Sequence, residues 1–178
     1  FVPNPVYWMA FLWPRLMSTR VLDLTVAAVP PPRSPSASAV TTSTSLVNSS
    51  KLIRAYAHCG LLLGGVTLAL INISPNETIS VNIKGLQAEP SDQPRQEYHF
   101  SGSASGDGGS GADNLASRVL HMRGKPVTTA SFQNPLLVPV AQPTQLAPLT
   151  LAFIDIPDAS AEICLATATP RQSPRSGD

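Results

Sequence analysis

A period of two in the side-chain pattern is the feature that most strongly constrains the fold of this chain. Four segments with this period are rich in β-branched or aromatic residues and are bounded by glycine, proline and asparagine, which is typical of strands. They lie at 52–58, 66–73, 78–84 and 149–156. Weaker strand signals lie at 97–100, 118–122, 126–130 and 161–165. About eight short strands with no helical pattern between them predict a mainly β chain, folded as an antiparallel β-sandwich.

One helix is expected before these strands. Asn4 can cap a helix, and Pro5 suits the first helical position, which needs no N–H partner. Residues 4–17 are apolar nearly all round, a pattern typical of a helix that is buried against a larger body. The residues that follow do not obviously form a larger domain that could bury this helix. Pro14 is expected to kink or end the helix, at a cost of about 3 kcal/mol if the helix continues.

Composition indicates long irregular stretches and excludes some classes of partner. Charged residues make up 13% of the chain and the net charge is +1, which argues against nucleic-acid binding because that needs clustered basic residues. The Pro/Ser/Thr-rich stretch 29–50 is expected to be a linker or insertion, 101–114 a mobile hairpin loop, and 169–178 a disordered tail. The longest apolar runs, 6–13 and 61–71, are shorter than the roughly 18 residues that cross a bilayer, so no transmembrane segment is expected.

Motifs for cofactors and metals are weak. Residues 106–111 match the dinucleotide fingerprint, but they lie in low-complexity sequence and are better interpreted as a plain loop. Asp107 and Asp113 lack the spacing of a calcium loop. The histidines at 58, 99 and 121 are far apart, without metal-ligand spacing, and are expected to be ordinary strand residues. We therefore expect no cofactor and no metal.

The four glutamates are the candidates for glycosidase chemistry, which needs two carboxyl groups on opposite sides of a sugar. They are Glu77, Glu89, Glu97 and Glu162. All four lie at predicted turns or strand edges, so solvated surface positions are expected. None resembles half of a buried acid pair.

Two cysteines and three glycosylation sequons bear on the compartment. Cys59 and Cys164 are the only cysteines. A disulfide between them would close a loop of about 100 residues and would stabilise the fold by at most about 4–5 kcal/mol. Two free buried thiols are the alternative. Asn48, Asn72 and Asn76 each begin an Asn-x-Ser/Thr sequon, which fits secretory transit, although such sequons also arise by chance in Ser/Thr-rich sequence. Asn72 is the weakest of the three, because it lies in a predicted strand.

Several collinear segments together resemble a known family. They are Asn4-Pro5-Val-Tyr7-Trp8 with Leu12-Trp13-Pro-Arg15-Leu16-Met17, Ile53-Arg54-Ala-Tyr56-Ala-His58-Cys59, Val66-Thr-Leu-Ala-Leu-Ile-Asn72, Glu97-Tyr98-His99, Gly124-Lys125-Pro126, and Ala147-Pro148-Leu149-Thr-Leu-Ala-Phe153. In this order they resemble plant heparanase-like proteins of glycoside hydrolase family 79. The resemblance spans roughly residues 3–166.

The resemblance implies a two-part enzyme: a (β/α)8 barrel that carries two catalytic glutamates, and a C-terminal β-sandwich. On this basis residues 1–22 are expected to be the end of the barrel with its last helix, 23–50 a linker or insertion, 51–168 the sandwich, and 169–178 a disordered tail. The catalytic glutamates would lie upstream, in a barrel that this chain lacks. The family's sandwich disulfide carries over to Cys59 and Cys164.

The expected function is that of a C-terminal fragment of a heparanase-like retaining β-glucuronidase, whose sandwich braces the barrel. Its partners would be the upstream barrel and, through that barrel, a glucuronic-acid-containing glycan. The chain alone is expected to be inactive, and its location to be secreted, extracellular, lysosomal or vacuolar, including the periphery of a membrane. The alternative is a stand-alone secreted β-sandwich that serves as a binding module, or an inactive truncated product.

Overall fold

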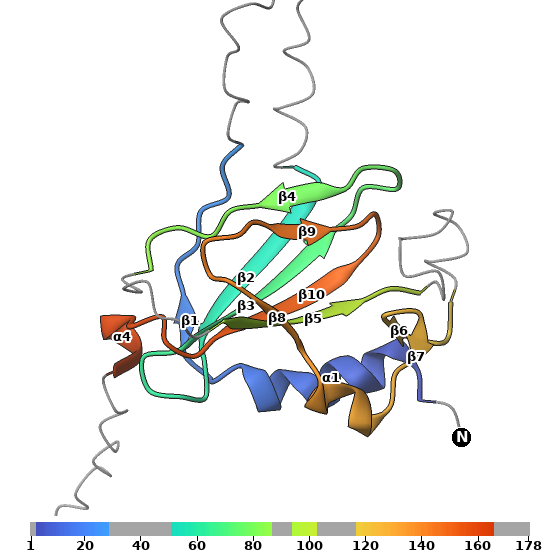
Figure 1. The fold of residues 1–178 in the computed structure, drawn as a ribbon, viewed down its shortest axis with the longest axis horizontal. Helices are drawn as coiled ribbons and strands as arrows, with labels where there is room; N and C mark the ends of the chain where they lie inside the picture. The colour runs from blue at the N-terminus through green and yellow to red at the C-terminus, as the bar shows by residue number, and fades with distance from the viewer. Residues whose placement is uncertain (1–2, 29–50, 87–93, 103–116, 166–178) are drawn as a thin grey trace, which may run out of the picture.

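The computed structural model describes residues 3–28, 51–86, 94–102 and 117–165. The expected linker at 29–50, most of the Gly-rich tract at 101–114 and the tail at 169–178 lie outside these residues, as do Asn48 and Glu89. The elements follow one another along the chain as shown in Figure 1. They are α1 (Pro5–Leu16), β1 (Val21–Leu22), β2 (Ile53–Cys59), β3 (Val66–Asn72), β4 (Ile79–Val81), β5 (Arg95–Phe100), β6 (His121–Met122), β7 (Lys125–Pro126), the 3-10 helix η1 (Thr129–Gln133), β8 (Leu136–Val138), β9 (Thr144–Leu146), β10 (Leu151–Ile156) and α4 (Glu162–Leu165).

In the part of the chain that the structure describes, the strands form one large antiparallel sheet and two small ones. The large sheet has the order β1-β2-β3-β10-β5-β8, so that β10 lies between β3 and β5. In this register Phe153 of β10 lies opposite Ala69 of β3 and Tyr98 of β5. Strands β4 and β9 pair with each other, as do β6 and β7. The predicted fold class, mainly β and antiparallel with one main helix, is confirmed.

One face of the large sheet packs against the β4–β9 pair. Because successive side chains of a strand point to opposite faces, Leu68 and Leu70 of β3 share this face with Ala152 and Ile154 of β10. These side chains form a single buried cluster with Leu146 of β9. In Figure 1 the β4–β9 pair lies over the large sheet, which gives the sandwich two layers of unequal size.

The other face of the large sheet packs against α1. Trp8 and Leu12 are 5% and 1% exposed and form a second buried cluster whose sheet residues include Phe100 and Phe153. The sheet therefore covers the inner side of this helix. The sequence did not predict this contact. As predicted, Asn4 caps the helix: its Oδ1 accepts a hydrogen bond from the Tyr7 amide at 2.9 Å.

Of the two outcomes expected at Pro14, a kink or an end of the helix, the end is not observed. The helix continues to Leu16, and the Met17 amide closes it by donating to the Trp13 carbonyl at 2.9 Å. Pro14 removes the donor that would have bonded the Ala10 carbonyl. Both residues lie on the exposed side of the helix, where water can donate a hydrogen bond to the Ala10 carbonyl.

Other differences from the predicted elements concern short segments. Where a strand is predicted at 161–165, residues 162–165 form a helical turn, α4. The signal at 126–130 marks only the end of β7, after which the chain enters η1. The signal at 118–122 yields only the two-residue strand β6. Strands β1, β8 and β9 were not predicted, because two or three residues are too few to show a period.

Candidate functional site

A disulfide joins Cys59, at the end of β2, to Cys164 in α4, with 5.4 Å between the Cα atoms. The predicted disulfide is therefore present. The backbone supports the same junction, because the Gly64 amide donates to the Cys164 carbonyl at 3.2 Å and the Ala161 amide donates to the Gly64 carbonyl at 3.0 Å. The β2–β3 hairpin and α4 are thus held as one unit.

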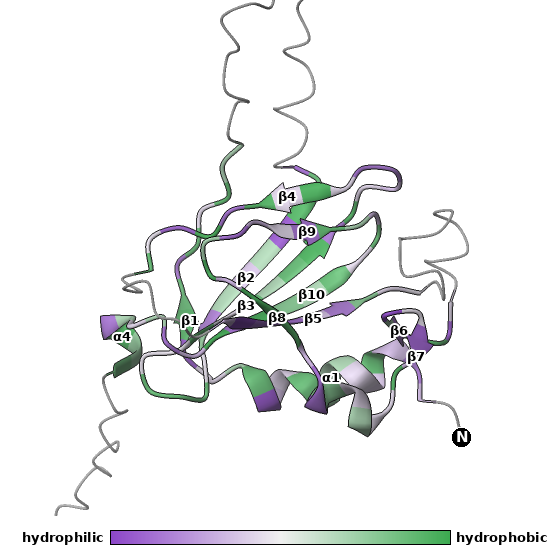
Figure 2. Ribbon diagram, viewed as in Figure 1, coloured by the Kyte–Doolittle hydropathy of each residue, from purple (hydrophilic) through white to green (hydrophobic). Residues whose placement is uncertain are grey.

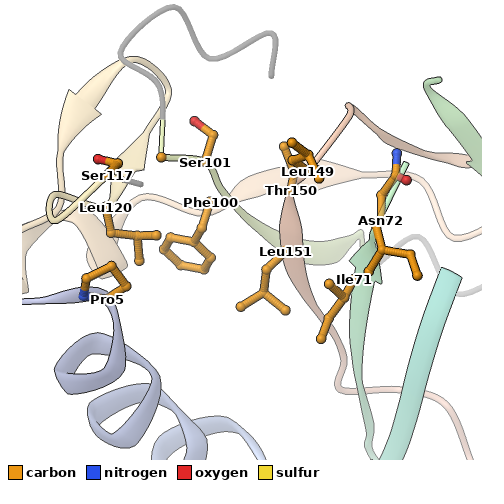
Figure 3. A pocket seen from close by; sticks show the side chains of 12 residues that line it. Pro5, Ile71, Asn72, Phe100, Ser101, Ser117, Leu120, Leu149, Thr150 and Leu151 are labelled. Atoms are coloured by element: carbon orange, nitrogen blue, oxygen red, sulfur yellow. The ribbon is translucent and has the colours of Figure 1, made fainter. Parts of the chain in front are cut away.

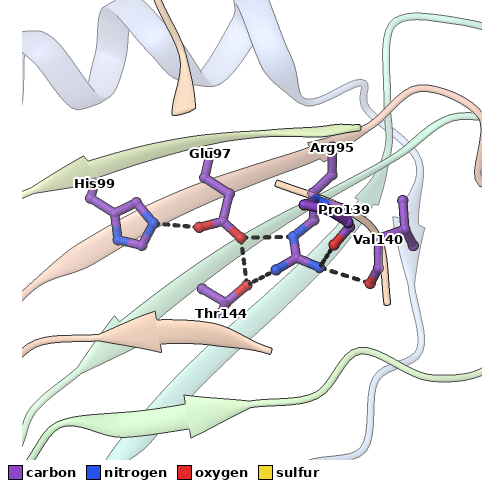
Figure 4. A network of polar contacts seen from close by, with 6 residues as sticks. All are labelled: Arg95, Glu97, His99, Pro139, Val140 and Thr144. Atoms are coloured by element: carbon purple, nitrogen blue, oxygen red, sulfur yellow. Dashed lines mark hydrogen bonds and ion pairs between the residues drawn. The ribbon is translucent and has the colours of Figure 1, made fainter. Parts of the chain in front are cut away.

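The main cluster of ionisable side chains in the described residues lies on β5. Arg95, Glu97 and His99 alternate along this strand, so all three point to the same face of the sheet, toward β9 (Figure 4). Nε of Arg95 lies 2.7 Å from Oε1 of Glu97, and Nε2 of His99 lies 2.6 Å from Oε2 of Glu97. Thr144 of β9 donates from its hydroxyl to Oε1 of Glu97 at 2.7 Å.

The guanidinium group of Arg95 links three parts of the chain. Nη1 donates to the backbone carbonyls of Pro139 and Val140 at 3.1 and 2.8 Å, and Nη2 donates to the Thr144 hydroxyl at 3.0 Å. Arg95 is 0% exposed and Glu97 is 4% exposed. A buried charge of this kind is tolerated only when it is paired and hydrogen-bonded, as both charges are here.

The cluster stabilises the ionised form of the Glu97 carboxyl group. Burial by itself raises this pKa, but the hydrogen bonds from His99, Thr144 and Arg95 favour the ionised form and together lower the pKa below its ordinary value. Glu97 is therefore an anion at neutral pH, with both oxygens occupied. Such a carboxylate is unsuited to act as a general acid, which needs a raised pKa, or as a nucleophile, which needs access to substrate.

The expectation that Glu97 is a solvated surface residue is wrong, because partners on two strands and a loop surround it. Glu77 and Glu162 are exposed, as expected. Arg95 and Thr144 were not identified from the sequence. The spacing of 95, 97 and 99 on one strand was a usable signal, since a period of two places all three side chains on one face; nothing in the sequence indicated that β9 would bring Thr144 to them.

The three histidines lie on three different strands. His58 of β2 places Nδ1 2.8 Å from the Ser18 carbonyl and packs edge-on against Trp13. His99 joins the cluster on β5, and His121 of β6 has a buried Nδ1 that finds no hydrogen-bond partner among the residues that the structure describes. Within the described parts of the chain, no group of three His, Cys, Asp or Glu side chains is placed to hold a metal ion.

A cavity of about 420 Å³ lies where α1 begins, between the ends of β3, β5 and β10 (Figure 3). Its apolar lining includes Pro5, Ile71, Phe100, Leu120 and Leu151. Its polar lining consists of amide, hydroxyl and backbone groups. Because no charged side chain lines it among the described residues, this cavity has no group for acid–base chemistry.

Two of the three sequons lie in the described residues. Asn72 is 1% exposed, and the two N–H groups of its Nδ2 are shared among the carbonyls of Glu77, Leu146 and Ala147, which lie 2.7, 3.0 and 2.9 Å away. A glycan on this nitrogen would break those bonds and occupy filled space, so the fold argues against Asn72 as an acceptor. Asn76 is exposed and stays a predicted acceptor.

Taken together, these features define a disulfide-linked antiparallel β domain whose buried charges support the fold. No protein-family profile matches the chain. It is 30% identical to heparanase-like protein 2 and, separately, to heparanase-like protein 1 of Arabidopsis thaliana, over 92% of its own length in both cases. It is 24% identical over 88% of its length to a baicalin-β-D-glucuronidase of Scutellaria baicalensis. The chain is a relative of the plant heparanase-like proteins.

The chain spans about a third of its curated relatives: 31% of each of the two Arabidopsis proteins and 25% of the Scutellaria protein. Among solved structures, it is similar to a GH51 α-L-arabinofuranosidase of Thermotoga petrophila RKU-1, with a TM-score of 0.38 and 10% identity over 59% of this chain and 19% of that one. That likeness is too distant to carry an argument. No helix in the described residues is long and apolar enough to span a membrane.

Proposed function

We propose that the chain is the C-terminal part of a family 79 heparanase-like hydrolase, and that its β domain braces a catalytic barrel located in the rest of the polypeptide. The observation that carries this proposal is the similarity over 92% of the chain to proteins of which it spans only 31%. In this proposal residues 1–22 are the end of the barrel, 23–50 a linker or insertion, 51–168 the sandwich and 169–178 a tail.

The geometry of the β5 cluster supports a structural role for this chain. A retaining glycosidase needs two carboxyl groups about 5–5.5 Å apart, one of which must donate a proton. Glu97 is paired with Arg95 and His99, not with a second acid. Hydrolysis would therefore depend on glutamates elsewhere in the full polypeptide. We propose a β-glucuronidase that acts on glucuronic-acid-containing glycans, in keeping with the glucuronidase among the relatives.

The disulfide and the sequons support the proposed compartment. Disulfides persist in oxidising compartments and are rare in the cytosol, so the Cys59–Cys164 bond favours a secreted or vacuolar protein. The exposed Asn76 fits the same route. Expression in a secretory host followed by mass spectrometry should show a glycan at Asn76 and none at Asn72.

The test is to obtain the complete transcript, express the full-length protein, and compare it with the 178-residue chain on an aryl β-glucuronide. We expect hydrolysis by the full-length protein and none by the 178-residue chain. Turnover by the short chain alone, or an upstream sequence without a barrel and its two glutamates, would overturn the proposal.

A stand-alone binding module is the second candidate, because aromatic side chains are open to solvent, among them Trp13 and Tyr56. Trp13 is 39% exposed and Tyr56 is 49% exposed, and exposed aromatic rings can serve as platforms for sugars. Binding of the 178-residue chain to a glycan array, lost in Trp13→Ala and Tyr56→Ala, would favour this candidate.

A further inference from the structure

A row of three polar groups links the end of α1 to the two central strands of the large sheet. Oγ1 of Thr67, on β3, lies 2.7 Å from the carbonyl oxygen of Leu16 and 2.8 Å from Oδ1 of Asp155, on β10. Figure 2 shows that β3 and β10 are hydrophobic along most of their length, so a polar pair within them stands out. Leu16 is the last residue of α1, and its carbonyl therefore finds no donor inside the helix. Within the described residues, the Thr67 hydroxyl is the group that donates to it.

The Thr67 hydroxyl has one proton and lies at hydrogen-bond distance from two oxygen atoms. A backbone carbonyl can only accept a hydrogen bond, and so can an ionised carboxylate. If Asp155 is ionised, one of the two contacts joins two oxygens with no proton between them. If Asp155 is protonated, its hydroxyl donates to Thr67, and Thr67 donates to the Leu16 carbonyl. Only the protonated form of Asp155 makes both contacts hydrogen bonds.

The surroundings of this pair disfavour a negative charge on Asp155. Gly60 packs against both side chains, because a Cβ atom at this position would lie 3.4 Å from Oγ1 of Thr67 and 3.5 Å from Oδ1 of Asp155. The Gly60 amide donates to the Gly65 carbonyl at 2.8 Å, so it does not donate to the carboxyl group. The C-terminal end of α1, which carries a partial negative charge, contacts the same hydroxyl. Burial raises the pKa of Asp155, and the contact with Thr67 offsets this only in part.

No cationic group among the described residues forms an ion pair with Asp155. In the strand register, His58 of β2 and Gln96 of β5 flank the Thr67–Asp155 pair on this face of the sheet. The charged side chains of β5 at 95, 97 and 99 point to the opposite face. Other ionisable groups on the surrounding elements are exposed, as Arg54, Tyr56 and Asp158 are, or have partners of their own. The latter are Arg15 on the Phe11 ring, Arg20 on the Ile163 carbonyl, His58 on the Ser18 carbonyl and the Tyr98 hydroxyl on Gln96.

We infer that the Leu16 carbonyl, the Thr67 hydroxyl and the Asp155 carboxyl group form a pH-sensitive switch, in which a protonated Asp155 fastens the end of α1 to the sheet. When Asp155 releases this proton to water, the carboxylate takes the hydrogen bond of the Thr67 hydroxyl. The Leu16 carbonyl then loses its donor, and the last turn of α1 is held less firmly. The inference does not rest on the proposed function. It means that the end of α1 packs more tightly on the sheet in an acidic compartment than in a neutral one.

Amide hydrogen exchange, measured by NMR on the 178-residue chain at pH 4 and pH 8, tests the switch. The reporters are the amides of Met17 and Ser18, which donate to the carbonyls of Trp13 and Cys59 at 2.9 Å. After correction for the intrinsic exchange rate at each pH, we expect their protection to be about three- to tenfold higher at pH 4, the effect of one hydrogen bond. The amides of β9, in the small sheet, are the internal reference and should change less.

Variants of the two side chains separate the switch from simple burial of a carboxyl group. Asp155→Asn supplies an N–H that can donate to Thr67 at any pH, so protection should be high and equal at both pH values. Thr67→Val has a similar shape without the hydroxyl, so protection should be low and equal at both, although Asp155 is still buried. Thr67→Ser keeps the hydroxyl and should restore the pH dependence. Asp158→Asn, which alters an exposed acid, is the matched control and should behave as wild type.

Equal protection of these amides at pH 4 and pH 8 in the wild type would overturn the inference. So would a pH dependence that survives in Asp155→Asn, which would assign it to another group, His58 in the first place, or one that survives in Thr67→Val. Infrared spectra give a second reading if Thr67→Val does not fold. The difference between wild type and Asp155→Asn should contain the band of a protonated carboxyl group in acid, and this band should disappear over the same pH range as the protection falls. Absence of that band from pH 4 to pH 8 would show that Asp155 holds no proton, and the switch would be refuted.

Discussion

At the scale of single residues, the buried charges are found where strands of different sheets meet. Arg95 on β5 reaches Thr144 on β9 and the carbonyls of Pro139 and Val140, so one guanidinium joins the large sheet, the small sheet and the loop between β8 and β9. Glu97 neutralises it within the interior. The sequence could have placed 95, 97 and 99 together on a strand, but it could not show that they are buried, because burial depends on β9.

Removal of the Glu97 side chain should destabilise the fold, because it leaves a buried cation without a partner. Glu97→Ala leaves the Arg95 guanidinium buried without its anion, and we expect a loss of roughly 3 kcal/mol in the free energy of unfolding. Urea denaturation monitored by circular dichroism measures it. The matched control is Arg95→Met/Glu97→Leu, which removes both charges and should be less destabilising than Glu97→Ala. A double variant that is the less stable of the two would contradict this account.

The fold disfavours the ionised form of Asp155 on β10, whereas it favours the ionised form of Glu97. Burial raises its pKa, and the hydrogen bond from the Thr67 hydroxyl at 2.8 Å lowers it only in part. A group whose pKa is raised on folding contributes stability below its unfolded pKa and loses that contribution as pH rises through its folded pKa. Asp155 therefore destabilises the fold at neutral pH.

Asp155→Asn should stabilise the protein at pH 7 and have little effect at pH 3. The amide oxygen can still accept from Thr67, and no charge has to be buried. Unfolding free energies measured by urea titration from pH 3 to pH 7 should show a gap between variant and wild type that widens with pH. Asp158→Asn, at an exposed position, is the control. A gap that narrows with rising pH would refute the assignment.

At the scale of elements, the length of a segment decided how well it could be predicted. Strands β2, β3 and β10, with six or seven residues each, were evident from their period. The capped start of α1 was evident from Asn4 and Pro5. Strands β8 and β9 exist because a neighbouring strand pairs with them. Residues 161–165 were misassigned because a tertiary bond, from the Ala161 amide to the Gly64 carbonyl, together with the disulfide, holds this segment as a helical turn.

Loss of the disulfide should release this last element. The two cysteines are 105 residues apart, so Cys59→Ser/Cys164→Ser should lower the free energy of unfolding by roughly 2–5 kcal/mol. Chemical denaturation measures the loss, and the wild-type chain under strong reductant should match the variant. Hydrogen exchange of α4 should rise before that of β3. Equal stability of the oxidised wild type and the double variant would contradict this expectation.

At the scale of the whole molecule, the large sheet is covered on both faces, by the β4–β9 pair on one and by α1 on the other. This explains the run of buried residues in β3, where Val66, Thr67, Leu68, Ala69 and Leu70 are all less than 5% exposed. The expected domain division separates residues 1–22 from residues 51–168. In the structure, however, α1 from the first part packs on the sheet of the second. Sequence pattern alone could not show this, because the two parts are far apart along the chain.

A chain that begins at residue 51 should therefore fold poorly. Without α1, the side chains of Ala69, Tyr98, Phe100 and Phe153 lose their cover. We expect residues 51–178 to bind a hydrophobic dye and to lack the cooperative thermal transition of the 178-residue chain. A soluble truncated chain with an unchanged transition would show that α1 is dispensable for the core.

The position of β10 has a consequence for biosynthesis. Strands β3 and β5 do not touch each other in the sheet; each pairs with β10, which is made about 80 and 55 residues later, respectively. The centre of the sheet cannot close until residues 151–156 have left the ribosome, and Cys59 has no partner until Cys164 follows. Contacts so distant in sequence form slowly and leave apolar strands open to aggregation meanwhile. Yield should therefore depend on chaperones and disulfide-forming enzymes that act after residue 164 has been made.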